Sequence, residues 1–318
     1  MIGPLVFIVL AWSIWHQLLR QPNWRESFVH IGEALQGNGL WQLGLAALLM
    51  LVNWSIEARK WQVVINRIQP IGFVQSLKAI FTGTTMAFFT PNRIGEYVGR
   101  ILYIDESKRV QGISLTIVCS IAQLLVTLVA GLGALAYMKQ VVAAQQPGDG
   151  SLVFWINTLL WCTAFGTAIL TLFYFRLAWL VRWIEKIPKI ERFVRYIHVL
   201  DSFNATILLR ILSLSVIRYI VFIGQYYLVF SVFEVSLTPV QVFASIGVVF
   251  LVLAVVPTIA VITELGVRWK ASIELVQFFS TNTWGVLATS LSIWIINLVI
   301  PALIGSLLIL GIRIFKNR

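Results

Sequence analysis

Residues 90–100 read Thr-Pro-Asn-Arg-Ile-Gly-Glu-Tyr-Val-Gly-Arg and interrupt an otherwise apolar region, residues 74–104. Pro91 divides this region into a piece of about 15 residues and a piece of about 11 residues. At the helical rise of about 1.5 Å per residue, the second piece reaches about 16 Å, roughly half of a bilayer's hydrocarbon core. The stretch therefore predicts a re-entrant hairpin of two half-helices. Irregular backbone at that depth is stable only when it is buried in protein or lines a wet cavity.

The whole chain has the composition of a polytopic α-helical membrane protein. Of its 318 residues, 59% are hydrophobic and 12% are charged, and the mean hydropathy is +0.87. Soluble domains carry about 25% charged residues, so this composition excludes a soluble enzyme and also a disordered or fibrous chain. The apolar stretches run nearly unbroken for about 20 residues, which the alternating strands of a β-barrel do not do. We therefore predict an all-α fold with one integral membrane domain over residues 1–318.

Six stretches are long and apolar enough to be full spans: residues 2–19, 39–57, 113–138, 152–174, 208–232 and 284–311. The first stretch lacks the basic start and the cleavage site of a signal peptide, so we expect it to be retained. A second interrupted region, residues 240–280, is broken at Pro257.

The basic residues indicate how the chain is oriented. The net charge of +11 would suggest nucleic acid in a soluble protein, but Lys and Arg also collect in the cytoplasmic loops of membrane proteins. With both termini in the cytoplasm and each interrupted region returning to its own side, 14 basic residues fall inside and three outside. This count does not separate a re-entrant hairpin from two short spans, because both place the loops on the same sides. We expect no nucleic-acid partner.

The inside loop over residues 175–207 has a character of its own. Its apolar residues recur near helical spacing, its basic residues fall mostly elsewhere on the helix, and Trp179 and Trp183 are interfacial residues. This pattern predicts an amphipathic helix on the anionic membrane surface, kinked at Pro188. A partner-protein site in this loop is the alternative.

The two interrupted regions resemble each other. Gln, Ile and Pro recur at a constant offset of 166 residues, as Gln75 and Gln241, Ile80 and Ile246, Pro91 and Pro257. Three full spans separate the regions, so one hairpin enters from the inside and the other from the outside. Inverted repeats with broken helices are typical of secondary transporters, whose substrate site lies between the repeats.

Charged side chains follow both prolines. They form two pairs at the i,i+4 spacing of a helix, Glu96 with Arg100 and Glu264 with Arg268. One interpretation is that these ion pairs pin the two hairpins. The other is that Arg93, Arg100 and Arg268 contact an anionic head group, while the two glutamates balance the charge or carry a proton. Helix N-termini after the prolines would add positive dipole ends to the same cavity.

Further polar and hinge positions complete the predicted site. Hinges are expected at Pro91, Gly95, Pro257 and Gly266, and additional candidates for the cavity are Thr90, Asn92 and Arg218. Glu57 and Arg59 lie at the inner end of the second predicted span, where we expect their side chains to snorkel to the surface.

The string that starts at Thr90 resembles a motif of the lysylphosphatidylglycerol synthase (multiple peptide resistance factor) family. The flippase-like transmembrane region of that family carries a pattern of Pro-x-Arg-x-Gly-Glu followed by an arginine. The matching positions in this chain are Pro91, Arg93, Gly95, Glu96 and Arg100.

The family's second motif is a proline-and-glycine stretch that leads to Gly-x-Arg-Glu. Pro257, Gly266 and Arg268 match it, whereas Trp269 stands where the glutamate is usual and the expected glycines near 260–264 are replaced. The resemblance covers nearly the whole chain in length and span pattern. In full-length synthases a soluble aminoacyl-transferase domain follows the membrane region, and we do not expect that domain here, because the chain ends just after its last span.

The resemblance implies lipid translocation and not aminoacylation. We expect a flippase-like protein of the inner membrane that moves or binds a lipid with a charged head group, either a phospholipid or a polyprenyl-linked lipid. One alternative is an intramembrane lipid-modifying enzyme that uses Glu96 and Glu264 as acid and base. Another is an accessory subunit of an envelope-assembly complex. We expect no cofactor and no metal. The sequence leaves open whether the protein binds a partner protein or forms a homo-oligomer in the membrane.

Overall fold

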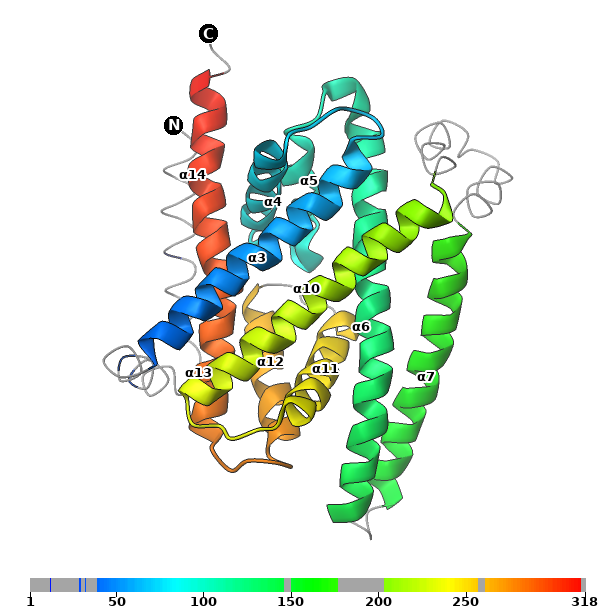
Figure 1. The fold of residues 1–318 in the computed structure, drawn as a ribbon, viewed down its shortest axis with the longest axis vertical. Coiled ribbons are helices and arrows are strands. Elements are labelled where there is room, and N and C mark those ends of the chain that lie inside the picture. The colour runs from blue at the N-terminus through cyan, green and yellow to red at the C-terminus, as the bar shows by residue number, and fades with distance from the viewer. Residues whose placement is uncertain are drawn as a thin grey trace.

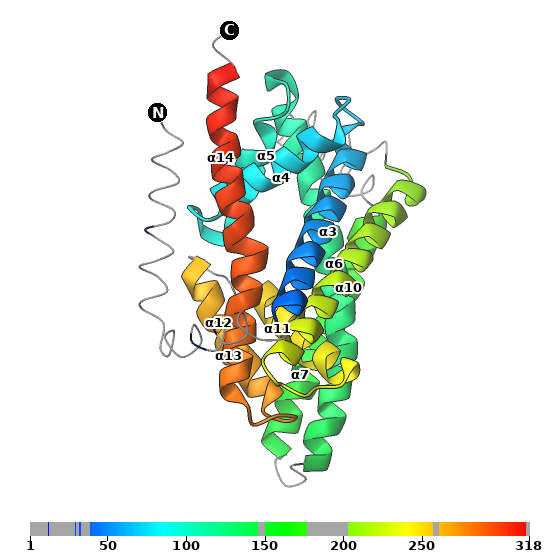
Figure 2. The ribbon, with the colours of Figure 1, turned by 60° about the vertical axis from the view of Figure 1, so that its left-hand side comes forward.

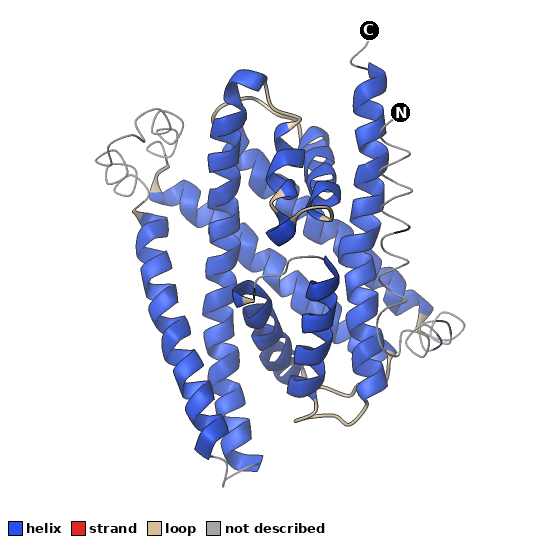
Figure 3. Ribbon diagram, turned by 180° about the vertical axis from the view of Figure 1, so that it is seen from behind, coloured by secondary structure: helices blue, strands red, loops and turns tan. Residues whose placement is uncertain are grey.

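The computed structural model describes residues 12, 29, 32, 39–145, 150–176, 203–256 and 261–315. These residues form helices and no strand, which confirms the all-α fold class (Figure 3). The main elements are α3 (Leu40–Ile65), α4 (Phe73–Ala87), η1 (Pro91–Arg93), α5 (Gly95–Ile101), η2 (Glu106–Lys108), α6 (Arg109–Gln145), α7 (Gly150–Phe175), α10 (Ala205–Val232), α11 (Pro239–Val255), α12 (Val261–Val276), α13 (Thr283–Trp294), the π-helix η4 (Ile295–Val299) and α14 (Ile300–Phe315).

Five helical stretches in the described part of the chain are long and apolar enough to span a bilayer: Leu40–Ile65, Glu106–Gln145, Gly150–Phe175, Ala205–Val232 and Thr283–Ile309. They confirm the five spans predicted from residue 39 onward. The predicted span 2–19 and most of the loop 175–207 lie outside the described residues. Helix α3 continues past its predicted end at residue 57, because most side chains of its last two turns are buried in protein and do not face water.

Both interrupted regions fold as helix hairpins that occupy opposite halves of the molecule. α4 packs beside α5 in one half, and α11 packs beside α12 in the other (Figures 1 and 3). The 15 residues of α4 reach about 22 Å and the seven residues of α5 about 10 Å, both short of a hydrocarbon core of about 30 Å. For the first hairpin, these lengths favour a re-entrant arrangement over two complete spans.

The first hairpin is held by close backbone contacts. A Cβ atom on Gly99 of α5 would lie 2.6 Å from the Cα atom of Gly83 in α4. On its other side, α4 packs against α14, where the Thr85 hydroxyl donates to the Ala302 carbonyl at 2.6 Å. Figure 2 shows the hairpin between α14 and α3. Small residues that let backbones approach are the usual means of helix packing in membranes, where apolar burial alone gives little attraction.

Helix α7 lies at the edge of the bundle and packs mainly on α6. It leaves large aromatic side chains exposed, including Trp155, Trp161 and Phe165, each at least 66% exposed. A soluble protein rarely shows such a continuous apolar surface, whereas a helix that faces lipid does.

We expect Gly99→Ala to destabilise the protein, because the new methyl group would overlap the backbone of α4. Overpacking of this kind costs about 1–3 kcal/mol. Gly166→Ala in α7 is the matched control, since a Cβ atom there meets no described atom within 4 Å and alanine is the better helix former. The melting temperature of each variant in detergent is measured, with size-exclusion chromatography as the readout of unfolding. Equal melting temperatures would contradict the close contact between α4 and α5.

Candidate functional site

A cavity of about 240 Å³ lies between the two hairpins. Four charged residues line it: Arg93 beside the bend of the first hairpin, Arg218 in α10, and Glu264 and Arg268 in α12. The other lining residues come from α6, α10 and α11, and they are Gln123, Thr127, Tyr219, Phe222, Phe250, Leu253 and Ala254. Largely apolar walls with a few converging polar groups are the usual form of a ligand site.

A smaller pocket of about 80 Å³ adjoins this cavity and shares its four charged residues. It extends to Trp54 in α3, Trp294 at the end of α13 and Asn297 in η4. A π-helix is rare and often occurs at functional sites, because its extra residue redirects the side chains of one turn. The break in α-helical geometry thus lies directly at the pocket.

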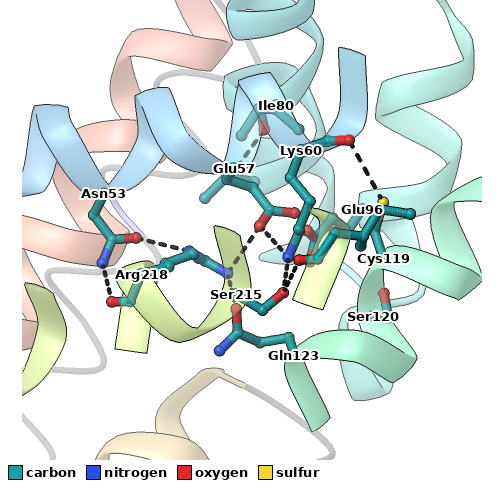
Figure 4. Close-up of polar contacts among 12 residues, drawn as sticks. Asn53, Glu57, Lys60, Ile80, Glu96, Cys119, Ser120, Gln123, Ser215 and Arg218 are labelled. Carbon is teal, nitrogen blue, oxygen red and sulfur yellow. Dashed lines mark hydrogen bonds and ion pairs between the residues drawn. The ribbon is translucent and has the colours of Figure 1, made fainter. Parts of the chain in front are cut away.

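Behind the cavity, the Glu57 carboxylate pairs with three cations from three helices, of which Figure 4 labels Lys60 and Arg218. Its Oε2 atom lies 2.7 Å from Lys60 Nζ in α3 and 3.1 Å from Arg218 Nη1 in α10. Its Oε1 atom lies 3.1 Å from Arg100 Nη2 in α5, and Arg100 also pairs with Glu96. Glu57 is 4% exposed, and Lys60 and Arg100 are 1% exposed. Buried charges are stable only when paired and hydrogen-bonded, so these contacts must form together.

Arg218 lies between this cluster and the cavity. Its Nε atom donates to Asn53 Oδ1 at 2.7 Å, and its Nη1 atom donates to Gln123 Oε1 at 3.4 Å. Its guanidinium carbon also lies 5.3 Å from the ring centres of both Trp54 and Phe222. Such cation–π contacts are strongest where water is excluded, and here they fix the guanidinium at the cavity wall.

The bend between α4 and α5 places Arg93 at the cavity. Asn92 and Arg93 have left-handed φ values of 50° and 59°, a conformation that costs a non-glycine residue roughly 1–2 kcal/mol. Two contacts enforce the bend. The Gly95 N–H donates to Thr90 Oγ1 at 2.6 Å, and a side chain on Gly95 would overlap the Met86 carbonyl. The cost of the left-handed residues is therefore offset by the surrounding structure.

Arg93 extends the buried cluster to the cavity. Its Nε atom lies 3.7 Å from Glu96 Oε2, and its side chain is 35% exposed. We call the following six residues the charge network: Glu57, Lys60, Arg93, Glu96, Arg100 and Arg218. Arg93 is the most exposed cation of the charge network and the one most accessible to a ligand.

The second hairpin carries a separate ion pair. Arg268 Nη2 donates to Glu264 Oε1 at 2.8 Å, and Arg268 Nη1 donates to the hydroxyl oxygen of Tyr226 in α10 at 2.7 Å. Both charged side chains keep more than a tenth of their surface exposed, unlike Arg100. The pair thus lies on the cavity wall and is tied to α10.

The structure divides the predicted binding residues into two groups. Both predicted i,i+4 pairs form. Arg93, Arg218, Glu264 and Arg268 line the cavity, whereas Glu96 and Arg100 lie behind it in the charge network and Thr90 and Asn92 shape the bend.

The structure places two of the four predicted hinge residues at a bend. Pro91 begins η1 and Gly95 begins α5, so both lie at the first bend. Pro257 lies outside the described residues. Gly266 lies inside the continuous helix α12, where a Cβ atom would meet no atom of the described chain within 4 Å, so the structure places no bend there and the hinge stays a prediction.

The expectation that Glu57 snorkels was wrong. It rested on a span that ends at residue 57, whereas α3 runs to Ile65 and buries Glu57 among cations. Arg59, on the other face of α3, is exposed as expected. A signal was present in the sequence, since Lys60 follows Glu57 at i,i+3 spacing and an ionisable residue within a span is by default a candidate for a functional site.

These features define an integral membrane protein in which two broken-helix hairpins enclose a charged cavity. Residues 1–305 match the family described as the lysylphosphatidylglycerol synthase TM region, and the chain belongs to this family. The match confirms the resemblance seen at residues 90–100. The family is a membrane domain of lipid-related proteins. A comparison with curated proteins gave no match.

We expect Glu57→Gln to destabilise the protein strongly, because it leaves three cations without their shared carboxylate. Removing one partner of a buried ion pair costs about 3–5 kcal/mol. Glu106→Gln is the control: this side chain is 79% exposed, and exposed pairs contribute about 0–1 kcal/mol. Melting temperatures in detergent compare the two. A Glu57→Gln protein as stable as wild type would refute the central role of this carboxylate.

Proposed function

We propose that this protein moves a membrane lipid with an anionic head group through the cavity between its two hairpins. The charge balance around the cavity carries this proposal. Among the described residues, the charge network has four cations and two carboxylates, an excess of two positive charges. The second ion pair, in α12, is neutral as a unit and does not change this balance.

An uncompensated charge inside a membrane is costly, at least about 2.5–3.5 kcal/mol at the bilayer centre. A bound phosphate group would reduce this cost, because it supplies negative charge at the cavity wall. The arginine fork matches phosphate oxygens in a bidentate way, and three arginines reach this cavity. The phosphate-bearing head of a phospholipid or of a polyprenyl-linked lipid fits this chemistry.

Three observations favour transport over catalysis by the glutamates. Glu96 and Glu264 are each engaged by an arginine, so neither carboxylate is free to act as acid or base on a substrate. Only Glu264 lines the cavity. The hairpins occupy opposite halves of the molecule, the arrangement in which a central site is opened alternately to each side.

The family and the apolar helices place the protein in a membrane. We propose further that this is the inner membrane and that both termini are cytoplasmic. Without Lys60, which is buried in the charge network, 13 basic residues fall inside and three outside, and this distribution supports the orientation.

We expect Arg93→Gln to weaken binding of an anionic lipid about tenfold or more, since a hydrogen bond to a charged group contributes about 1.5–3 kcal/mol. Native mass spectrometry with phosphatidic acid measures binding, and a fluorescent phosphatidic acid in proteoliposomes measures transfer between leaflets. Arg210→Gln, at an exposed position of α10, is the control.

A competition experiment shows whether the site binds a lipid or a soluble anion. Glycerol phosphate and inorganic phosphate are titrated against bound phosphatidic acid. Displacement by the soluble anions at equal concentration would show that the site takes free phosphate and would contradict lipid transport. Unchanged lipid binding and transfer in Arg93→Gln would contradict the proposed site.

A further inference from the structure

A second, apolar opening lies beside the charged cavity. It is a groove of about 410 Å³ between α6, α7, α10 and α11. Its lining residues are Leu125, Val126, Val129, Ala130, Thr171, Phe175, Leu212, Val216, Tyr219, Ile220 and Phe243. Among these, only Thr171 and Tyr219 carry a polar side-chain atom, so the groove suits a hydrocarbon chain and not a polar ligand.

The groove follows from how α7 is attached. Tyr174, near the end of α7, donates its hydroxyl to the Leu208 carbonyl at 2.8 Å and so joins α7 to the start of α10. From that point the two helices diverge, as Figures 1 and 3 show, while α7 stays packed on α6. Thr171 and Phe175 of α7 line the groove together with Leu212, Val216 and Ile220 of α10.

Groove and cavity share one wall. Three consecutive residues of α10 form this wall. Arg218 lines the cavity, Ile220 lines the groove, and Tyr219 lines both. Tyr219 is 5% exposed, so its ring is packed in place between the two openings.

Helix α6 repeats this division. Gln123 and Thr127, one turn apart, line the cavity, and Val126 and Ala130, also one turn apart, line the groove. These pairs lie on neighbouring faces of the helix, because their positions differ by three residues. The polar and apolar openings therefore lie side by side along two helices.

We propose that the groove holds a hydrocarbon chain of the lipid whose anionic head group lies in the cavity. This inference rests on the proposed function and adds the position of the chain. A head group that enters the cavity must remain attached to a chain that stays in an apolar environment, and the groove provides that environment directly beside the arginines. Since lipid tails are as apolar as the bilayer, the groove contributes packing and orientation more than affinity.

The test uses two lipids that differ only in the head group. Phosphatidic acid and phosphatidylcholine, each with a photoreactive diazirine in one acyl chain, are added to the full-length protein in phosphatidylcholine vesicles. After irradiation, the labelled peptides are identified. In the wild type, the phosphatidic acid probe should label residues 125–130 and 212–220 several-fold more than the phosphatidylcholine probe.

Matched variants test the groove itself. Ala130→Phe places a ring in the groove and should lower this labelling several-fold. Ala136→Phe makes the same change at an exposed position of the same helix that does not line the groove, and it should leave the labelling unchanged. Melting temperatures of both variants confirm that any loss does not come from unfolding.

The outcomes separate the two proposals. If both probes label equally in a protein that still selects phosphatidic acid in mass spectrometry, that result would contradict the groove as the acyl-chain site but would not contradict the cavity as the head-group site. So would unchanged labelling in a folded Ala130→Phe protein. A wild-type preference for phosphatidic acid in Arg93→Gln would instead overturn the cavity as the head-group site.

Discussion

The pairing of Glu57 with three cations is the constraint on which the rest of the structure depends. Lys60, Arg100 and Arg218 come from three different helices and meet at one buried carboxylate. Helices in a membrane gain little from apolar burial against each other, so their relative positions must be set by close packing and polar contacts. Here the first hairpin is fixed against α3 and α10 by charges that are unfavourable in any arrangement that separates them.

Helix α10 links the two hairpins. Arg218 joins it to the charge network, and Tyr226, two turns or roughly 12 Å further along, accepts a hydrogen bond from Arg268 of the second hairpin. The two attachments differ in the number of charged groups that take part. The first involves several charges that are almost fully buried, whereas the second is one hydrogen bond beside a partly exposed ion pair. Helix α10 is therefore joined to α3 through Glu57 and to α12 through Arg268.

Features encoded locally could be predicted from the sequence, and features that depend on distant residues could not. Apolar runs and a proline with charged residues after it predict the spans, the first hairpin and the i,i+4 pairs, because the partners are near in sequence. The pairing of Glu57 with Arg218 joins residues 161 positions apart, and no local pattern indicates it. The error at Glu57 arose from ending α3 too early, because the polar residues after residue 57 suggest the end of a span whereas the helix continues among buried partners.

The excess positive charge connects this scaffold to the proposed lipid site. Arg93 is held at the cavity by two left-handed residues, and Glu96, its carboxylate partner, is already shared with Arg100. A ligand that brings negative charge to Arg93 reduces the repulsion within the charge network and so stabilises the arrangement of helices that binds it. Binding of an anionic ligand at Arg93 and the position of the first hairpin would then be coupled, because each favours the other. A neutral or cationic head group would not have this effect, because it leaves the excess charge uncompensated.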